Sequence, residues 1–401
     1  MKGEDQMGLS LSGVRILDLS MVMAGPYCTL ILGDLGAEVI KIERPGTGEG
    51  ARGMPPYFFE DESAYFIAMN RNKKSVTLDL RTDKGKDIFY QLVEKSDVVV
   101  NNFRPGVMER LKIDYPVLKK MNPRIIYCSI TGFGSTGPLK DRPAFDLIIQ
   151  ARGGVMSYTG EPGRMPVRMG APMGDLAGGL FAANGILAAL YQREHTGRGQ
   201  SIDISLLDCQ ISLLTYRGEY YFVGGEIAQP VGSGHVSAHP IRAFKTKTFD
   251  IVLDLNTQNI FERFCRKIGR DELADNPKFQ SREARFDNRA EIYSIFEEIF
   301  LEKTGEEWLD LLETEIPIAP INTVDKALND PQVLGRNMVV EVDYGKGKKL
   351  KILGNPIKMS EITEEVFTTP PRLGEHNEPV LKELLGYSSQ EIQQLREENI
   401  M

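Results

Sequence analysis

The chain has 401 residues, of which 41% are hydrophobic and 26% are charged. Those proportions are typical of a globular protein and exclude a disordered, collagen-like or fibrous chain. The 48 basic and 56 acidic residues give a net charge of −8, which argues against a general nucleic-acid-binding protein.

The cysteines and the first residues indicate the compartment. The four cysteines are far apart, with no CxxC pair and no histidine–cysteine cluster, so we expect neither a disulfide scaffold nor a zinc site. Residues 1–6 carry charges of both signs and lead into no apolar segment. We therefore expect a cytoplasmic protein without a membrane anchor or a bound metal.

The first third of the chain alternates short β-branched runs with helical patterns. The helical patterns occupy residues 26–35 and 83–94. Strands separated by helices predict βαβ units and a mostly parallel sheet. The expected strands cover residues 14–18, 39–42, 75–78, 97–100 and 124–129.

The middle of the chain holds a long apolar segment that follows Asp175. Residues 176–192 are uncharged but are interrupted by glycines, and they are too few for a bilayer span, so they predict a buried helix. A strand over residues 201–204 and another apolar helix come next. Glycine, serine and proline then dominate residues 224–239, which we expect to be a linker.

The last third is mainly helical. A strand over residues 350–352 and two short helices form its tail, and the second helix begins with a capping-box pattern from Ser388 to Glu391. Before the tail, five apolar residues have the spacing of one helix face. They are Ile292, Ile295, Phe296, Ile299 and Phe300.

Motifs of several common enzyme classes are missing or stand in the wrong context. A GxGxxG pattern covers residues 48–53, but Met54, Pro55 and Pro56 follow where a dinucleotide site needs a regular helix, so we expect a flexible glycine loop. The chain has no GxxxxGK[ST] pattern, so no motif indicates ATP use. Neither a GxSxG nor an HExxH pattern accompanies the four histidines, which are His195, His235, His239 and His376.

Asp175 stands at the start of the long apolar helix, and local spacing leaves its role open. As an N-cap residue it would accept hydrogen bonds from the first free N–H groups of that helix. As a nucleophile it would attack a carbonyl group, because a helix N-terminus favours the ionised carboxylate. The neighbouring Gly174, Gly178 and Gly179 would leave space for a bulky substrate.

Several collinear segments decide between these roles, because together they resemble the class III CoA-transferases. This family includes formyl-CoA transferase, crotonobetainyl-CoA:carnitine CoA-transferase and α-methylacyl-CoA racemase. The resemblance covers nearly the whole chain. Its segments are residues 14–26 (VRILDLSMVMAGP), 35–45 (LGAEVIKIERP), 72–80 (NKKSVTLDL), 97–110 (DVVVNNFRPGVMER), 174–208, 316–334 and 373–385.

The resemblance implies that Asp175 is the catalytic residue of a CoA-transferase. In such enzymes the aspartate attacks an acyl-CoA, and CoA passes through a mixed anhydride and an aspartyl-CoA thioester to an acceptor acid. CoA thioesters are then substrates, and no permanently bound cofactor is expected. The implied CoA-binding residues are Val22, Ala24, Arg44, Leu78, Arg81, Asn102, Phe103, Val107 and Arg110. The implied substrate-binding residues are Met23, Tyr65, Asp146, Gly234 and His235.

Two departures from the family patterns bear on the reaction. The racemases use a His–Asp pair where this chain has Phe145 and Asp146, and the phenylalanine side chain has no group that can accept or donate a proton. Met21 and Met23 replace the histidine and glutamine of the formyl-CoA enzymes, which favours a larger, more apolar acid than oxalate. The alternatives to CoA transfer are an acyl-CoA racemase or epimerase and a non-catalytic CoA-binding subunit of a hetero-oligomer.

The resemblance also implies a fold. We expect an α/β protein whose Rossmann-like large domain is built from both ends of the chain, residues 1–223 and 326–401. Residues 224–239 would be a linker, and residues 240–325 a smaller α+β domain. Two chains would interlock as a homodimer, with an acyl-CoA and a carboxylic acid as its other partners and neither nucleic acid nor membrane bound.

Overall fold

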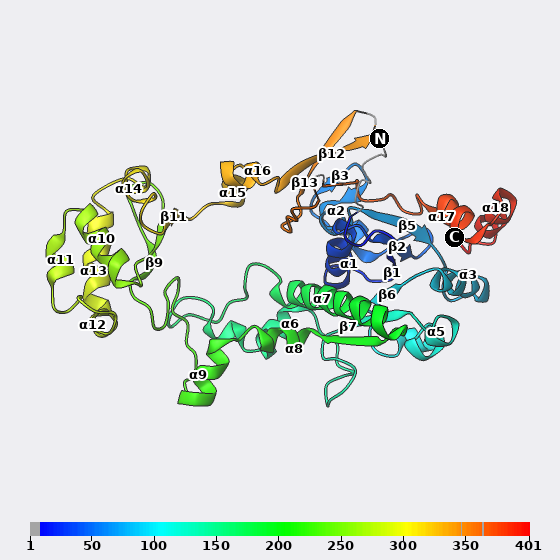
Figure 1. Cartoon of the computed structure of the whole chain (residues 1–401), viewed down its shortest axis with the longest axis horizontal. Helices are drawn as coiled ribbons and strands as arrows, with labels where there is room; N and C mark the ends of the chain where they lie inside the picture. The colour runs from blue at the N-terminus through cyan, green and yellow to red at the C-terminus, as the bar shows by residue number, and fades with distance from the viewer. Residues whose placement is uncertain (1–8, 346, 363–364) are drawn as a thin grey trace. The chain divides into compact units, whose positions relative to one another are not determined.

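The computed structural model describes residues 9–345, 347–362 and 365–401, and they form two compact units (Figure 1). The first unit comprises the described residues up to Val155, Met169–Glu219 and Gln332–Met401. The second comprises Met156–Arg168 and Tyr220–Pro331. The predicted large domain contained residues 156–168, whereas in the structure this segment groups with the second unit.

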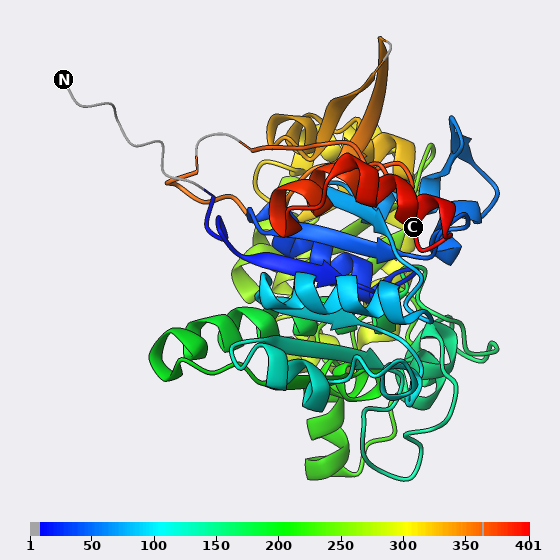
Figure 2. The same ribbon diagram turned by 90° about the vertical axis from the view of Figure 1, so that its right-hand side faces the viewer.

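A six-stranded parallel sheet forms the centre of the first unit (Figure 2). Its spatial order is β5-β2-β1-β6-β7-β8, so the chain moves outward from β1 in one direction and then restarts at β6 on the other side. That reversal is the Rossmann arrangement, and it confirms the predicted parallel sheet. The strands are β1 (Arg15–Asp18), β2 (Glu38–Glu43), β5 (Lys73–Thr77), β6 (Val98–Asn101), β7 (Ile126–Thr131) and β8 (Ser201–Ser205).

Helices cover both faces of this sheet. Consecutive strand residues point to opposite faces, so neighbours in one strand belong to different cores. Ile16 packs in one apolar core with helices α1 (Ala24–Asp34), α6 (Asp146–Arg152), α7 (Met173–Thr196) and α8 (Leu206–Ser212). Its neighbour Leu17 packs in the other core. That core contains α3 (Asp83–Glu94), α5 (Tyr115–Met121), α17 (Asn377–Leu385) and α18 (Ser389–Glu397), so the end of the chain packs on the sheet formed by its beginning.

Helix α7 is the one helix in the described parts of the chain that is long and apolar enough to cross a membrane, by length and composition only. Ala182 and Ile186 of α7 are buried in the core beside the sheet. The same test is passed by core helices of proteins that lie outside membranes, and this packing is that of the buried helix predicted from the sequence.

Short elements complete the first unit. The hairpin of β12 (Val339–Gly345) and β13 (Lys348–Leu353) packs against Ile67 of α2 (Ala64–Met69). The capping box predicted for α18 is present, since Ser388 Oγ accepts from Glu391 N and Glu391 accepts from Ser388 N. The other elements are η1 (Gly50–Gly53), β3 (Phe58–Phe59), β4 (Glu62–Ser63), α2 (Ala64–Met69) and α4 (Val107–Leu111).

The second unit has a small antiparallel sheet and an aromatic core. The strand order is β11-β10-β9, formed by Ile318–Pro320, Ile251–Asp254 and Ile241–Phe244. The predicted apolar face lies on α13 (Arg289–Phe300), whose Phe296 and Phe300 are buried in this core. The other helices here are α10 (Gln258–Lys267), α11 (Asp271–Asp275), α12 (Arg282–Asp287), α14 (Gly305–Leu312) and α15 (Val324–Leu328). Three elements span the sequence boundaries between units: η2 (Val155–Tyr158), α9 (Tyr216–Gly224) and α16 (Pro331–Gly335).

Candidate active site

A cavity of about 510 Å³ lies at the carboxyl ends of four neighbouring strands in the sheet of the first unit. The residues that line it follow those strands: Met21 after β1, Arg44 after β2, Leu78 after β5 and Phe103 after β6. Open parallel sheets bind ligands at this edge, where the strand order reverses. The volume is within the range of sites for organic ligands, about 300–1,000 Å³.

Four of the predicted CoA-binding residues line this cavity: Arg44, Leu78, Arg81 and Phe103. Arg44 and Arg81 are exposed, which suits contact with the phosphates of a ligand. The Arg81 guanidinium is paired with Asp79, with Nε 2.8 Å from Oδ1 and Nη2 2.7 Å from Oδ2. A phosphate that binds Arg81 therefore competes with Asp79.

The other five predicted CoA-binding residues do not line the cavity but lie within a few residues of those that do. Val22 and Ala24 belong to the connection between β1 and α1 and to the first turn of α1. The Asn102 amide accepts from Met21 N and donates to Met21 O, both at 2.8 Å. Val107 and Arg110 are on α4, which reaches the cavity through Leu111.

The glycine pattern at residues 48–53 lines the same cavity, which sequence reasoning missed. Gly50–Gly53 is a single 3₁₀ turn rather than the flexible loop that we predicted. Its Arg52 is buried and bonded to Glu43 and Glu62, with Nη2 2.7 Å from Glu43 Oε1 and Nη1 2.6 Å from Glu62 Oε1. These ion pairs fix the loop from within the protein.

Asp175 is the third residue of α7, so of the two roles that local spacing left open it does not fill that of the N-cap. The N-cap position is Pro172, whose side chain caps nothing. Instead Asp146 Oδ1, from the first turn of α6, accepts from Gly174 N at 2.8 Å and from Asp175 N at 3.4 Å. Because Asp146 supplies the cap, the half-buried Asp175 carboxylate is not needed for it.

The surroundings of Asp175 alter its ionisation. Burial, with a smaller contribution from the Asp146 charge, raises the pKa of Asp175 from its ordinary value of 3.8 to about 6. Burial and the charges of Asp175 and Asp146 raise the pKa of Tyr65 on α2, so this predicted substrate residue is in the same electrostatic environment. At neutral pH most of Asp175 is ionised and able to act as a nucleophile.

The bonds of Asp146 are those of a positioning residue. Its Oδ2 accepts from Gln150 Nε2 at 2.7 Å, and Gln150 Oε1 accepts from Met169 N at 2.8 Å. Both oxygens of the buried Asp146 carboxylate are thus engaged within the protein. They hold the segment before α7 and the first turn of α7 itself.

The glycines near Asp175 provide close packing, which corrects the expectation that they leave space for substrate. A Cβ on Gly178 would lie 2.2 Å from Leu206 Cδ2, and one on Gly179 would lie 2.7 Å from the Ala24 carbonyl oxygen. Helix α7 therefore contacts α8 and the first turn of α1 directly. Asp175 is one helical turn before Gly179, the residue that packs against the start of α1.

The two methionines have different environments. Met21 is 36% exposed and lines the cavity, whereas Met23 is 9% exposed and is part of the buried interior at the start of α1. The predicted preference for an apolar acid relied on both side chains. Only Met21 is available to an occupant of this cavity.

Gly234 and His235 belong to the second unit, not to the unit that holds Asp175. They line a cavity of about 660 Å³ together with Arg242 and Arg289. His235 Nδ1 accepts from Ser237 N at 3.2 Å and from Ala238 N at 3.1 Å, so the ring hydrogen is on Nε2.

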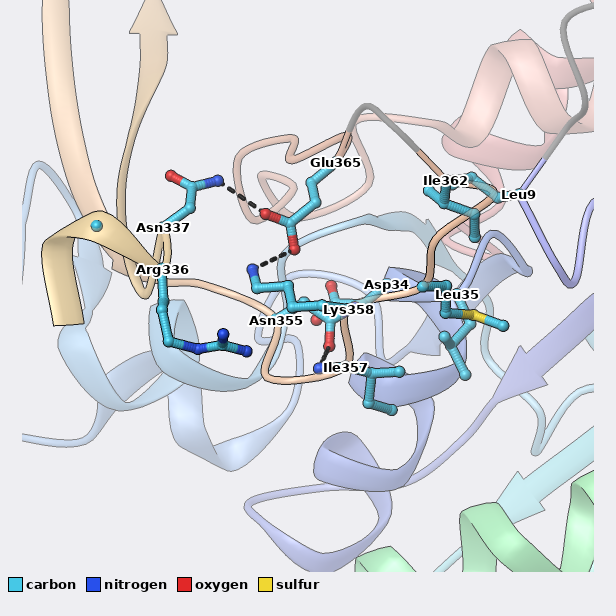
Figure 3. Close-up of a pocket in the computed structure, with 12 residues that line it drawn as sticks. Leu9, Asp34, Leu35, Arg336, Asn337, Asn355, Ile357, Lys358, Ile362 and Glu365 are labelled. Carbon is cyan, nitrogen blue, oxygen red and sulfur yellow. Dashed lines mark hydrogen bonds and ion pairs between the residues drawn. The ribbon is translucent and has the colours of Figure 1, made fainter. Parts of the chain in front are cut away.

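A third cavity, of about 340 Å³, contains none of the predicted residues (Figure 3). Its two acidic side chains are paired, Glu365 with Lys358 at 2.6 Å and Asp34 with Arg71 at 2.5 Å. Within residues 9–345, 347–362 and 365–401, no group of acidic, histidine and cysteine side chains is arranged to hold a metal ion.

Comparison with known proteins shows the family of the chain. The family model described as CoA-transferase family III matches residues 11–377. The chain belongs to this family. It is therefore an enzyme, a family III CoA-transferase, and the family's substrates are CoA thioesters.

Similar proteins of known activity and structure cover most of the chain. It is 40% identical to mouse succinyl-CoA:glutarate CoA-transferase, over 96% of this chain and 88% of that protein. It is 39% identical to acetyl-CoA:oxalate CoA-transferase of Acetobacter aceti, over 87% and 88%. The crystal structure of a CaiB/BaiF family protein from Brucella suis is similar, with a TM-score of 0.83, 34% identity and coverage of 94% of this chain and all of that one.

Proposed function

We propose that this enzyme moves CoA from an acyl-CoA to a free dicarboxylic acid, with Asp175 as the nucleophile. An Asp175 oxygen attacks the thioester carbon, the C–S bond breaks, and CoA thiolate leaves a mixed anhydride. The thiolate then attacks the aspartyl carbonyl, which releases the donor acid as a carboxylate and forms an aspartyl-CoA thioester. An acceptor carboxylate repeats these steps in reverse, and Asp175 is regenerated.

One observation carries this proposal: the cap of α7 is supplied by Asp146, while Asp175 stands half-buried beside it with a raised pKa. The Asp175 carboxylate therefore does not serve as the cap of α7 and is available for a reaction. The contact between Gly179 and Ala24 supports a position of Asp175 near the connection that borders the CoA cavity.

The choice of a dicarboxylic acid rests on the similar proteins, whose names specify glutarate and oxalate. It replaces the expectation of an apolar acid, since Met23 is buried and Met21 alone gives weak grounds for it. The racemase alternative lacks a base, because Phe145 carries no proton and its side chain is exposed at the start of α6. A non-catalytic role would not require Asp175.

We also propose that the enzyme is a cytoplasmic, interlocked homodimer whose large domain is built from both ends of the chain. Helix α9 has no buried residue, and its Tyr221, Phe222 and Val223 are exposed. Such an apolar surface suits cover by a second copy of the chain. Mixing differently tagged dimers under native conditions should yield no hybrids, and rapid hybrid formation would contradict interlocking.

The activity is tested by incubating purified enzyme with succinyl-CoA or acetyl-CoA and a series of acids, followed by mass spectrometry of the CoA products. Glutarate, mesaconate or oxalate should be converted faster than monocarboxylic and aromatic acids. Exchange of the α-hydrogen of an acyl-CoA without any acceptor acid would favour a racemase instead.

A further inference from the structure

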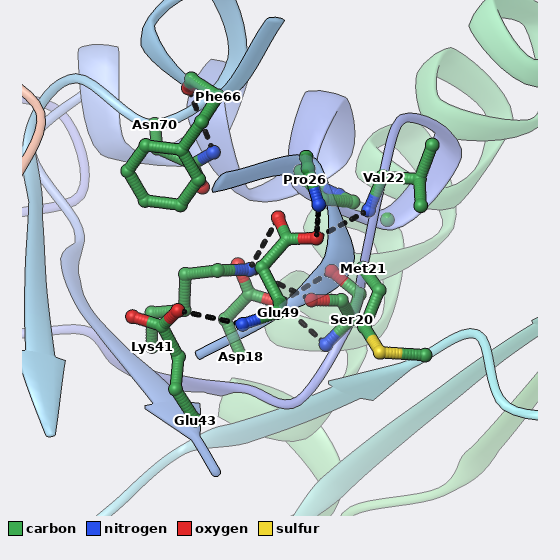
Figure 4. A network of polar contacts seen from close by, with 12 residues as sticks. Asp18, Ser20, Met21, Val22, Pro26, Lys41, Glu43, Glu49, Phe66 and Asn70 are labelled. Atoms are coloured by element: carbon green, nitrogen blue, oxygen red, sulfur yellow. Dashed lines mark hydrogen bonds and ion pairs between the residues drawn. The ribbon is translucent and has the colours of Figure 1, made fainter. Parts of the chain in front are cut away.

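The connection between β1 and α1 is held in an unusual conformation at the edge of the CoA cavity. Val22 has φ of +69°, in the left-handed region that is rare for a β-branched residue. Strained conformations of this kind persist only where surrounding groups enforce them, and they cluster at functional sites. The groups that enforce this one are buried side chains (Figure 4).

The backbone groups of Ser20 and Met21, which precede Val22, are bonded to side chains that belong to or directly follow three different strands. Ser20 N donates to Asp18 Oδ1 at 2.9 Å, and Ser20 O accepts from Lys41 Nζ at 2.7 Å. Met21 is held on both sides by Asn102. These contacts fix the connection up to Met21 from within the sheet.

Val22 is held by a residue outside the sheet, Glu49 of the glycine loop. Glu49 Oε2 accepts from Val22 N at 3.1 Å and from Ala51 N at 2.8 Å. Glu49 is 5% exposed, and its Oε1 has no hydrogen-bond partner among the described residues, with Lys41 Nζ 3.5 Å away. Burial of an incompletely bonded charge is unfavourable, so a carboxylate in this position indicates a specific role for Glu49.

We propose that Glu49 is a positioning residue for CoA binding, which holds Val22 in the left-handed conformation and so fixes the β1–α1 connection against the cavity. This proposal rests on the proposed use of the cavity by CoA. Glu49 lines that cavity and belongs to the GxGxxG segment. The segment thus has a role here that differs from pyrophosphate binding by glycine N–H groups.

The link between Glu49 and Val22 can be tested with a substitution that removes the strain. Glycine adopts positive φ without steric cost, so Val22→Gly should make the connection less dependent on Glu49. Glu49→Ala should raise the Kd for CoA about 10- to 100-fold, the factor for one hydrogen bond to a charged group. Glu49→Gln keeps an acceptor for Val22 N and should lose less. Because Val22 is itself a predicted CoA-binding residue, Val22→Gly alone is the reference, and adding Glu49→Ala to it should raise the Kd much less than adding Glu49→Ala to wild type.

The experiment is isothermal titration of CoA into wild type and these variants, with denaturant unfolding of each in parallel. Glu38→Ala is the matched control. Glu38 is also an ion-paired carboxylate, but it lies at the amino end of β2, whereas the cavity lies at the carboxyl end. This control should keep the wild-type Kd. Should Glu49→Ala not fold, Glu49→Gln with and without Val22→Gly gives the same comparison.

An unchanged Kd in Glu49→Ala, or a rise in Kd as large in the Val22→Gly background as in wild type, would overturn the proposal. If Glu49 contributed to stability alone, Glu49→Ala would lower the free energy of unfolding and leave the Kd of the folded protein for CoA unchanged. Failure of the proposed function is distinguishable, since wild type would then bind CoA without transferring it. Absence of CoA binding by wild type would overturn both.

Discussion

The first turns of α7 and α8 begin alike in the sequence but differ in the structure. Each has an aspartate as its third residue, Asp175 and Asp208. Helix α8 is capped by its own Ser205, whose Oγ accepts from Asp208 N at 3.1 Å, and Asp208 is exposed. Helix α7 is capped by Asp146 from another helix, and Asp175 is half-buried. A cap supplied from elsewhere leaves a carboxylate free for chemistry.

The largest expected effect comes from removing the two aspartate charges in turn. Asp175→Asn should reduce kcat by about a thousandfold or more, because the amide lacks the anionic oxygen that attacks the thioester. Asp208→Asn, at the matching helix position, should keep near-normal turnover. Steady-state kinetics of the two folded variants, checked by circular dichroism, makes the comparison. Equal losses of kcat in both variants would contradict the different roles assigned to Asp175 and Asp208.

The two caps should differ in what they control. Ser205→Ala and Asp146→Ala should each cost about 0.5–2 kcal/mol of unfolding free energy, the usual effect of losing a cap. Only Asp146→Ala should also lower kcat, by about 10- to 100-fold, because it releases the helix turn that carries Asp175. Urea unfolding and kinetics measured on the same samples test this. A kcat loss in Ser205→Ala would show that activity follows stability in general.

The pH dependence should report the burial of Asp175. With its pKa near 6, kcat/KM should fall about tenfold per pH unit below that value, as the nucleophile is protonated. Asp146→Asn removes the charge that adds to the shift, so the midpoint should move to lower pH. A pH–rate profile with no midpoint between pH 5 and about 7 would contradict the assignment.

The same pKa predicts an effect on stability, with a definite sign. Because the pKa of Asp175 is higher in the folded protein than the ordinary 3.8, the ionised carboxylate opposes folding above pH 6. This cost shrinks as the pH falls from 6 and disappears below 3.8. Asp175→Asn should therefore raise the unfolding free energy at pH 8, by at most about 3 kcal/mol, with no gain at pH 3.

The smallest effects are expected at the two exposed arginines of the cavity. Arg44→Ala should raise KM for the acyl-CoA about tenfold with kcat little changed, if it contacts a phosphate. Arg81→Ala should raise KM less, because Asp79 already occupies the Arg81 guanidinium. Measuring KM for the acyl-CoA in wild type and in both variants tests this expectation. A fall in kcat alone in Arg44→Ala would show instead that Arg44 stabilises the transition state.

The strands and the long helix were predictable because their signals are local. The alternation of β-branched runs with helical patterns gives β1, β2, β5, β6 and β7 within a few residues. The capping box of α18 involves residues three apart. Family resemblance named Asp175 and four residues that line the cavity, since those motifs are contiguous.

The predictions that were wrong or left open concern contacts between distant residues. The cap of α7 comes from Asp146, 28 residues before Gly174, and nothing in the helix sequence reveals it. The rigidity of the glycine loop depends on Arg52 and Glu43, and the burial of Met23 depends on packing of α1.

The most direct measurement of the central claim is chemical trapping at Asp175. Wild type incubated with its acyl-CoA donor and hydroxylamine, then digested and examined by mass spectrometry, should carry a hydroxamate on the peptide that contains Asp175. Borohydride should reduce an aspartyl thioester at the same residue, and the Asp208→Asn protein should be trapped like wild type. Continued CoA transfer with no modification at Asp175, or transfer by Asp175→Asn at a near-normal rate, would contradict the covalent mechanism.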